Sequence, residues 1–209
     1  RALAVADLDG DGLPEIAAGC DDEKVHLLDR SGTLQWSFTC KRSQGSADGL
    51  ACVDYVEIAD LEGDGKAELV VGASWVHVLN PDGSVRWEKY MDLRRGRICG
   101  DFAAGTIADI NADGIQEILA LFITSYPLLQ VLDHDGNLIL PANPEIHRGL
   151  NISMPVDVAA LALFADGRKK QIVCATADGL SFFWEDHEAR EQGGGRIARP
   201  CIGMAAYQP

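Results

Sequence analysis

Three copies of one short acidic motif, regularly spaced along the chain, constrain the fold more than any other feature. The motif reads DLDGDGLPEI from Asp7, DLEGDGKAEL from Asp60 and DINADGIQEI from Asp109. A weaker fourth copy, LFADGRKKQI, aligns Asp166 with Asp113. Self-similarity at a fixed period of roughly 50 residues indicates a repeat architecture, in which each unit is one supersecondary structure packed on its neighbours.

Within each unit the apolar residues alternate with a period of two, which is the period of a strand. In the first unit ALAVAD enters the acidic loop, PEIAAGC leaves it, and KVHLLD and TLQWSF lie on either side of a tight-turn sequence. That turn reads DRSG, NPDG and DHDG in successive units, where Asp or Asn opens the turn and Gly supplies the positive φ. Four short antiparallel strands per unit are typical of a β-propeller blade.

We therefore predict an all-β chain of about four β-propeller blades, each a sheet of four antiparallel strands. The blades are expected at residues 1–40, 51–90, 103–140 and 156–198, and residues 199–209 are expected to form a strand of a further or closing blade. A lone arc of blades leaves sheet faces and edges open. The chain is therefore expected to be part of a larger propeller or a half-ring.

The acidic motif has the donor spacing of a cation loop, but not that of a helix–loop–helix calcium site. An EF-hand places a bidentate Glu at loop position 12, where this chain has Ala18, Val71 and Ala120. Here the closing acid stands at position 9, and an apolar, strand-like run follows it. Glycine at position 6 lets the backbone turn back and present the carbonyl of position 7. The motif therefore predicts a calcium site between two strands.

Calcium takes six to eight oxygen ligands, and alternating carboxylates in a tight loop supply them. Without a cation these carboxylates repel one another, so the metal is expected to order the loops. We expect about three Ca²⁺ sites. The predicted ligands are Asp7, Asp9, Asp11, Leu13, Glu15, Asp60, Glu62, Asp64, Lys66, Glu68, Asp109, Asn111, Asp113, Ile115 and Glu117. The fourth copy lacks acids at positions 1 and 3 and carries RKK, so it is expected to bind no calcium.

The chain carries 18 Lys and Arg against 32 Asp and Glu, a formal charge of −14. This charge argues against nucleic acid or an anionic membrane surface as a partner. No apolar run approaches the roughly 20 residues that span a bilayer, which argues against membrane insertion. The sequence starts at Arg1 without a signal peptide or initiator Met, which favours a piece of a longer precursor.

Six cysteines are present, and none form a CxxC pair, which argues against a zinc ribbon or a redox pair. Cys20 and Cys174 lie in apolar runs, where buried free thiols are common. Cys40 and Cys52 flank a loop rich in Gly and Ser, and their spacing allows them to pair across it. We expect an extracellular or periplasmic protein with some disulfides, of a connectivity that the sequence does not give.

Positions that break the repeat are better candidates for ligand binding than repeated ones. The pairs His26/His77 and Trp36/Trp87 recur in equivalent strands and are expected to serve the blade. Long loops on a rigid scaffold often carry binding residues. The weak ligand-binding candidates from such loops are Arg94, Arg95, Arg97, His147 and Arg148. No GxSxG, HExxH or Walker motif occurs, so no catalytic residue is predicted.

The segments DLDGDGLPEIAAG, DLEGDGKAELVVGA and DINADGIQEILAL resemble FG-GAP/VCBS-type repeats, the blades of integrin α-subunit propellers and of many bacterial secreted proteins. The chain departs from the family in two ways, because the Gly-Ala-Pro element is reduced to GAS and no Phe-Gly pair occurs. The LLDRSGTLQW half of the repeat is more similar to bacterial variants. The resemblance implies a seven- or eight-bladed propeller, calcium in the loops, and a non-catalytic role in binding proteins or glycans, in adhesion or in assembly. Some polysaccharide lyases are also similar, so the alternative is the propeller domain of a carbohydrate-active enzyme.

Overall fold

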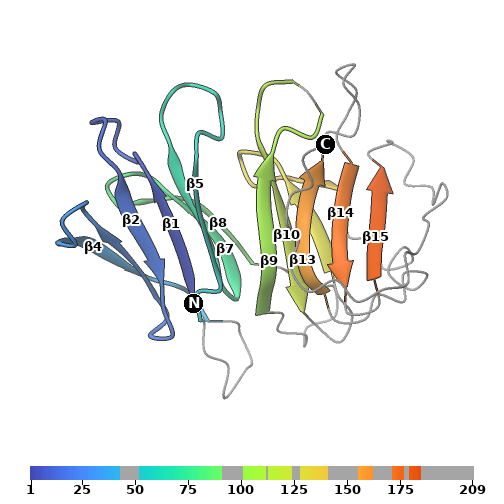
Figure 1. The fold of residues 1–209 in the computed structure, drawn as a ribbon, viewed down its shortest axis with the longest axis horizontal. Helices are drawn as coiled ribbons and strands as arrows, with labels where there is room; N and C mark the ends of the chain where they lie inside the picture. Colours follow the sequence, from blue (N-terminus) through green and yellow to red (C-terminus); the bar gives the residue numbers. More distant parts are fainter. Residues whose placement is uncertain are drawn as a thin grey trace.

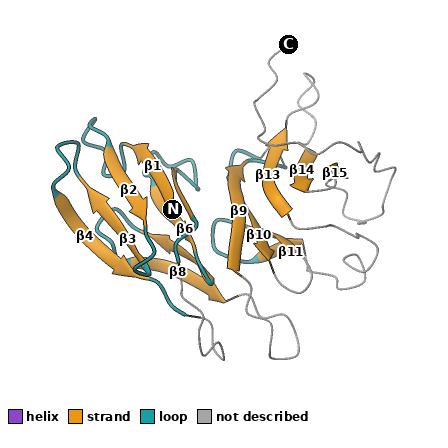
Figure 2. Cartoon of the chain, turned by 60° about the horizontal axis from the view of Figure 1, so that its bottom comes forward, coloured by secondary structure: helices purple, strands orange, loops and turns teal. Residues whose placement is uncertain are grey.

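The chain folds into a series of antiparallel sheets, each made of consecutive strands (Figures 1 and 2). The computed structural model describes residues 1–42, 52–90, 101–111, 113–123, 128–140, 155–161, 171–176 and 179–184. The elements found within these residues are all strands. The described part of the chain holds no helix long and apolar enough to cross a membrane. The prediction of an all-β fold built from four-stranded antiparallel blades is confirmed.

The strands of each sheet follow one another in chain order. The first blade contains β1 (Ala2–Ala6), β2 (Glu15–Gly19), β3 (Lys24–Leu28) and β4 (Leu34–Thr39). The second contains β5 (Tyr55–Ala59), β6 (Glu68–Gly72), β7 (Trp75–Leu79) and β8 (Val85–Tyr90). The third contains β9 (Asp101–Ala108), β10 (Glu117–Ile123), β11 (Leu128–Leu132) and β12 (Leu138–Leu140). A fourth sheet contains β13 (Pro155–Leu161), β14 (Gln171–Thr176) and β15 (Gly179–Trp184). The fourth acidic copy at 162–170 and the segment 199–209 lie outside the described residues.

Each acidic loop closes the hairpin between the first two strands of its blade, in the same register three times. The last residue of the first strand pairs with the Glu that opens the second strand: Ala6 with Glu15, Ala59 with Glu68, and Ala108 with Glu117. The tight turns between the third and fourth strands have Gly at positive φ, as predicted, at Gly32, Gly83 and Gly136. One sequence pattern therefore builds one hairpin geometry in each unit.

Apolar side chains from successive blades pack against one another and form the core. One cluster joins Val25 and Leu27 of the first blade to Val56 and Leu69 of the second. A second cluster joins apolar residues of the second blade to the third, among them Phe102 of β9. The first strands of the sheets are neighbours in series, β1 beside β5, β5 beside β9 and β9 beside β13. The first three sheets are thus stabilised by burying apolar surface between neighbouring blades.

The repeated tryptophans also join the blades. The Trp36 indole N–H of β4 donates to the Pro81 carbonyl of the second blade at 2.9 Å, and Trp87 of β8 donates to the His134 carbonyl of the third at 2.7 Å. Each ring lies over the turn glycine of the neighbouring blade, so closely that a Cβ at Gly83 would stand 2.9 Å from the Trp36 ring. The expectation that the two repeated tryptophans serve the fold is confirmed.

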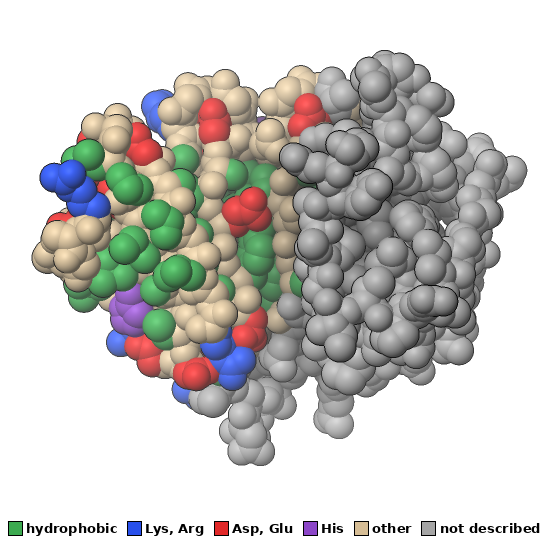
Figure 3. Space-filling view, viewed as in Figure 1, with side chains coloured by type: hydrophobic (Ala, Val, Ile, Leu, Met, Phe, Trp, Pro, Cys, Tyr) green, Lys and Arg blue, Asp and Glu red, His purple; other side chains and the backbone are tan. Residues whose placement is uncertain are grey.

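One face of the first blade lacks the cover that the same face has in the second blade. Leu3 and Val5 of β1 are 67% and 57% exposed, whereas the equivalent Val56 is 7% exposed and packs on the first blade. Gly32 occupies the same turn position as Gly83, but nothing lies within 4 Å of the Cβ that it lacks. Figure 3 shows hydrophobic side chains grouped at the surface over this end of the molecule.

The described cysteines are free thiols. Cys40 is buried in the apolar cluster between the first two blades, and this burial raises the pKa of its thiol to about 12. Cys52 lies at the other side of residues 43–51 and is also unpaired. The pairing that the spacing of Cys40 and Cys52 allowed is therefore wrong, because Cys40 serves as a small apolar core residue.

Gly83→Ala should destabilise the protein more than Gly32→Ala. Both glycines have φ near +80°, at +81° and +84°, so the backbone strain of the two substitutions is matched. Only the Cβ at residue 83 collides with a tryptophan ring, and overpacking of this kind costs about 1–3 kcal/mol. Urea unfolding of the two variants measures the difference, and equal losses would show that the indole contact does not join the blades.

Candidate metal sites

The first Asp of each acidic loop organises the loop by accepting hydrogen bonds from backbone amides. The Asp7 carboxylate accepts the N–H of Gly10 at 2.8 Å and of Gly12 at 2.9 Å. Asp60 repeats these contacts with Gly63 and Gly65, and Asp109 accepts the N–H of Gly114. Burial alone would raise the pKa of Asp60, but its amide hydrogen bonds lower the pKa below its ordinary value. Asp60 is therefore held as an anion.

The Glu at position 9 closes the loop from the other side. One oxygen of Glu15 accepts the buried Leu8 N–H at 2.8 Å, and Glu68 and Glu117 accept the N–H of Leu61 and Ile110 at 3.1 and 2.8 Å. All three Glu side chains are buried. The sequence predicted these residues as cation ligands, and this second role as acceptors for a buried amide was missed. The sequence signal for this role is the apolar residue at position 2 of all three loops. When that residue is buried, its backbone N–H needs a hydrogen-bond acceptor.

The residues at position 7 are tied to the loop through their amides. The N–H groups of Leu13, Lys66 and Ile115 donate to the position 5 acids Asp11, Asp64 and Asp113 at 2.7, 2.9 and 2.8 Å. The Asp9 carboxylate likewise accepts the N–H of Asp11 at 3.1 Å. The predicted ligands of each loop therefore lie in one compact turn. The binding of a cation by their carboxylates and carbonyls stays a prediction.

The first loop gathers uncompensated negative charge. One oxygen from each of Asp7, Asp9 and Glu15 lies within 4.8 Å of the other two. Two oxygens bound to one Ca²⁺ at 2.3–2.6 Å stand at most about 5 Å apart, so this spacing fits a shared ion. No ion pair between these three side chains and a Lys or Arg is found among the described residues. A hard divalent cation would relieve the repulsion among them.

The second loop already has a cation of its own. The Arg86 guanidinium of β8 forms ion pairs with Glu62 and, at 2.8 Å, with Glu68. Burial raises the pKa of Glu68, and the Leu61 amide and Arg86 oppose that rise. Lys66 lies 3.5 Å from Asp64. By repeat alignment Gln35 stands at the place of Arg86 in the first blade and Ile139 in the third, so this neutralisation belongs to the second blade.

The third loop uses an amide in place of a charge. The Asn111 side chain donates to Glu117 at 3.0 Å, and its oxygen accepts the Asp113 N–H at 2.9 Å. The third loop is also joined to the second, because the Gln116 N–H donates to the Leu61 carbonyl at 2.9 Å. The three loops share a backbone frame and differ in how their acidic side chains are balanced.

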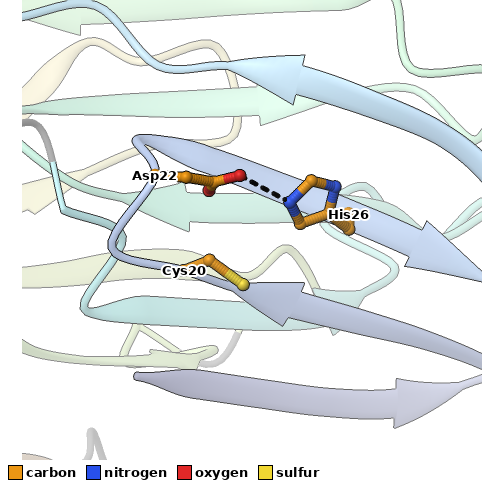
Figure 4. A group of neighbouring side chains, drawn as sticks. All are labelled: Cys20, Asp22 and His26. Carbon is orange, nitrogen blue, oxygen red and sulfur yellow. Dashed lines mark hydrogen bonds and ion pairs between the residues drawn. The ribbon is translucent and has the colours of Figure 1, made fainter.

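A group that the sequence did not single out lies at the turn between β2 and β3. Figure 4 shows Cys20, Asp22 and His26 around one point, with Asp22 Oδ2 3.1 Å from His26 Nε2. The sequence signal that could have revealed this group is the longer connection between β2 and β3. Residues 20–24 stand where the second blade has only the three residues 73–75. The equivalent His77 is fully buried against Phe38, and burial lowers the pKa of its imidazole to about 4.

A mixed group also lies between the second and third blades. His134 Nε2 is 3.4 Å from Asp135 Oδ2 and 3.9 Å from Glu62 Oε1. Because Glu62 is already paired with Arg86, this group is part of a charge network across the blades. The predicted ligand-binding residues at 94, 95, 97, 147 and 148 lie outside the described residues, so their arrangement stays a prediction.

Comparison with known proteins agrees with this geometry. The sequence profile described as an FG-GAP-like repeat matches residues 7–71. A search of curated protein sequences gives no match. Among solved structures the chain is similar to rhamnogalacturonan lyase YesW, with a TM-score of 0.59 at 16% identity over 84% of this chain and 40% of that one.

Two further structures show the same likeness. BBS1N, solved in complex with ARL6DN, has a TM-score of 0.58 at 14% identity, over 87% of this chain and 53% of that one. A protein of unknown function from Bacteroides caccae has a TM-score of 0.54 at 13% identity, over 94% of this chain and 60% of that one. The chain therefore spans about 40–60% of the length of these three proteins. Residues 7–71 are thus FG-GAP-like repeat sequence, within a chain that has the fold of a β-propeller.

Proposed function

We propose that this chain is a calcium-stabilised, non-catalytic propeller module that serves binding or assembly outside the cell. The observation that carries the proposal is the first acidic loop, where three carboxylates converge within 4.8 Å on a framework of backbone hydrogen bonds. This donor set is hard and anionic, as Ca²⁺ requires. The same framework recurs in the second and third blades, so calcium binding would belong to the repeat.

An extracellular location follows from the calcium role. Structural calcium modules of extracellular proteins often bind with Kd of about 10⁻⁴–10⁻³ M, a range in which only the exterior of a cell keeps the sites filled. The chain's net charge of −14 also favours the binding of cations. The same charge argues against a nucleic-acid partner. Arg95 and His147, whose substitution would test a carbohydrate-active enzyme, lie outside the described residues, so the propeller domain of such an enzyme stays the alternative.

Calcium should raise the thermal stability of the protein, and Asp9→Asn should reduce that rise. A ligand at ten times its Kd stabilises the folded state by about 1.4 kcal/mol per site. The asparagine keeps the oxygen that accepts the Asp11 N–H but removes one charge from the first loop. Melting curves in calcium and in EDTA measure the effect. Asp166→Asn in the fourth copy is the control and should leave the shift unchanged, whereas a melting temperature insensitive to EDTA would remove the calcium role.

Arg86→Gln should make the second loop more dependent on calcium. The substitution copies Gln35 of the first blade and frees Glu62 and Glu68 from their internal counter-ion. We expect a lower melting temperature in EDTA, a larger rise on adding calcium, and tighter or additional calcium uptake in equilibrium dialysis. Arg42→Gln, which breaks the pair with Glu23 away from the acidic loops, is the matched control. An Arg86→Gln loss that is equal with and without calcium would make the arginine a purely structural partner.

The assembly part of the proposal concerns the uncovered face of the first blade. Its partner is a further blade of the same kind, because the second and third blades each receive one blade on this face. That blade would cover Leu3 and Val5 and bring an outer-strand tryptophan to the turn at Gly32, as Trp36 and Trp87 do for the following turns. The interface would then continue the pattern of the two described seams.

Leu3→Lys and Val56→Lys test this assembly as an equivalent pair. In the chain alone, the lysine at residue 3 should be nearly neutral, and the lysine at residue 56 should cost roughly 3 kcal/mol because it places an unpaired charge in a packed seam. In a longer protein that carries the additional blade, both lysines should be costly. Thermal unfolding measures both effects, and a neutral Leu3→Lys in that longer protein would contradict the proposed blade contact.

A further inference from the structure

The turn between β2 and β3 holds a second kind of donor set, unlike that of the acidic loops. Cys20 follows the end of β2, Asp22 lies in the turn and His26 belongs to β3 (Figure 4). One donor atom from each side chain lies within 4.8 Å of the other two. Cys20 and His26 are partly exposed and Asp22 is half exposed, so an ion from solvent can reach them. A thiol, an imidazole and a carboxylate are therefore available at one accessible point.

This donor set selects a class of metal. Calcium and magnesium prefer oxygen ligands, whereas thiolate and imidazole ligands favour zinc and its neighbours in the first transition row. Tetrahedral zinc with bonds of about 2.0–2.3 Å needs donor atoms about 3.3–3.8 Å apart. Asp22 and His26 already stand 3.1 Å apart, and the thiol needs to move by about 1 Å at most. The three side chains would leave a fourth position for water or a partner group.

A further contact orients the imidazole for this role. His26 Nδ1 lies 2.7 Å from the Ser37 hydroxyl of β4, across the strand pair that places His26 opposite Ser37. A metal-bound histidine usually donates its other ring N–H to a nearby acceptor, which fixes the ring and its tautomer. With Nδ1–H donated to Ser37, the Nε2 lone pair is directed to the side where Asp22 stands.

The group also departs from the repeat in a way that a purely structural turn would not need. The second blade connects the same two strands through Ala73, Ser74 and Trp75, a turn with no thiol or acid, and its histidine is buried. The first blade has Cys20 in place of Ala73 and adds acidic residues to the turn. The neighbouring acids form ion pairs elsewhere, Asp21 with Arg1 and Glu23 with Arg42. Asp22 instead contacts His26.

We propose that Cys20, Asp22 and His26 bind one Zn²⁺ ion, or a similar transition-metal ion, independently of the calcium loops. On binding, the thiol gives up its proton and becomes the thiolate ligand. His26 binds the metal through the Nε2 lone pair and keeps its single ring proton on Nδ1, donated to Ser37. No oxidant or reductant is required, because neither the metal nor the thiolate changes oxidation state.

Cobalt and zinc titrations of the chain in excess calcium test the site. Calcium occupies any hard acidic loop, so the added metal reports the mixed donor set. We expect one equivalent of Co²⁺ to give a thiolate-to-cobalt charge-transfer band in the near ultraviolet, and Zn²⁺ to displace it. Zinc affinity from competition with a chromogenic chelator should fall roughly 10-fold in Ser37→Ala, which removes only the orienting contact.

The variants assign the band to its residues. Cys20→Ser should abolish the charge-transfer band, and His26→Gln should abolish tight zinc binding. Cys52→Ser and His134→Gln, which alter a second thiol and the histidine between the other blades, should retain both. Circular dichroism confirms that each variant is folded. The proposal is overturned if no band forms, if the band survives Cys20→Ser, or if it is lost only in Cys52→Ser. Failure of calcium binding in the EDTA experiment would leave this site unaffected.

Discussion

Burial of apolar surface between successive sheets is the interaction on which the rest of the structure depends. A four-stranded sheet has two faces, and in this chain both faces carry Val, Leu and Ala side chains that one sheet cannot bury alone. Stacking the sheets solves this problem once per repeat, and the tryptophan hydrogen bonds to Pro81 and His134 fix where each sheet lies on the next. The acidic loops can then vary in charge, because the seams hold the blades together.

The acidic loops show how one backbone frame carries different electrostatics. A first Asp that collects amides and a buried Glu that accepts the position 2 amide recur in three blades. Around that frame the first loop keeps its negative charge, the second pairs with Arg86 and the third exchanges a carboxylate for the Asn111 amide. The frame is thus set by hydrogen bonding, and the charge of each loop is set by individual side chains.

Much of this fold can be predicted from the sequence, because its signals are local and repeated. Period-two alternation located the strands, Gly in the DRSG-type turns predicted positive φ, and the spacing of the acids predicted the loops. The features that were missed depend on neighbours in space. Arg86 reaches the second loop from a different strand, Cys40 is free because it packs into a seam, and His26 differs from His77 because only the latter is covered by another blade. A period in the sequence cannot show which faces are covered.

Arg86 gives the middle of this chain a permanent counter-ion that does not exchange with solvent. If the carboxylates of the first loop are neutralised by dissolved calcium, as we propose, the stability of the first blade depends on calcium concentration more than that of the second. The acidic hairpin of the first blade would lose order while that of the second blade, held by Arg86, kept its shape, so removal of calcium would loosen the blades unequally. The hairpin of the first blade would then be more accessible to proteases and partners at low calcium than at high calcium.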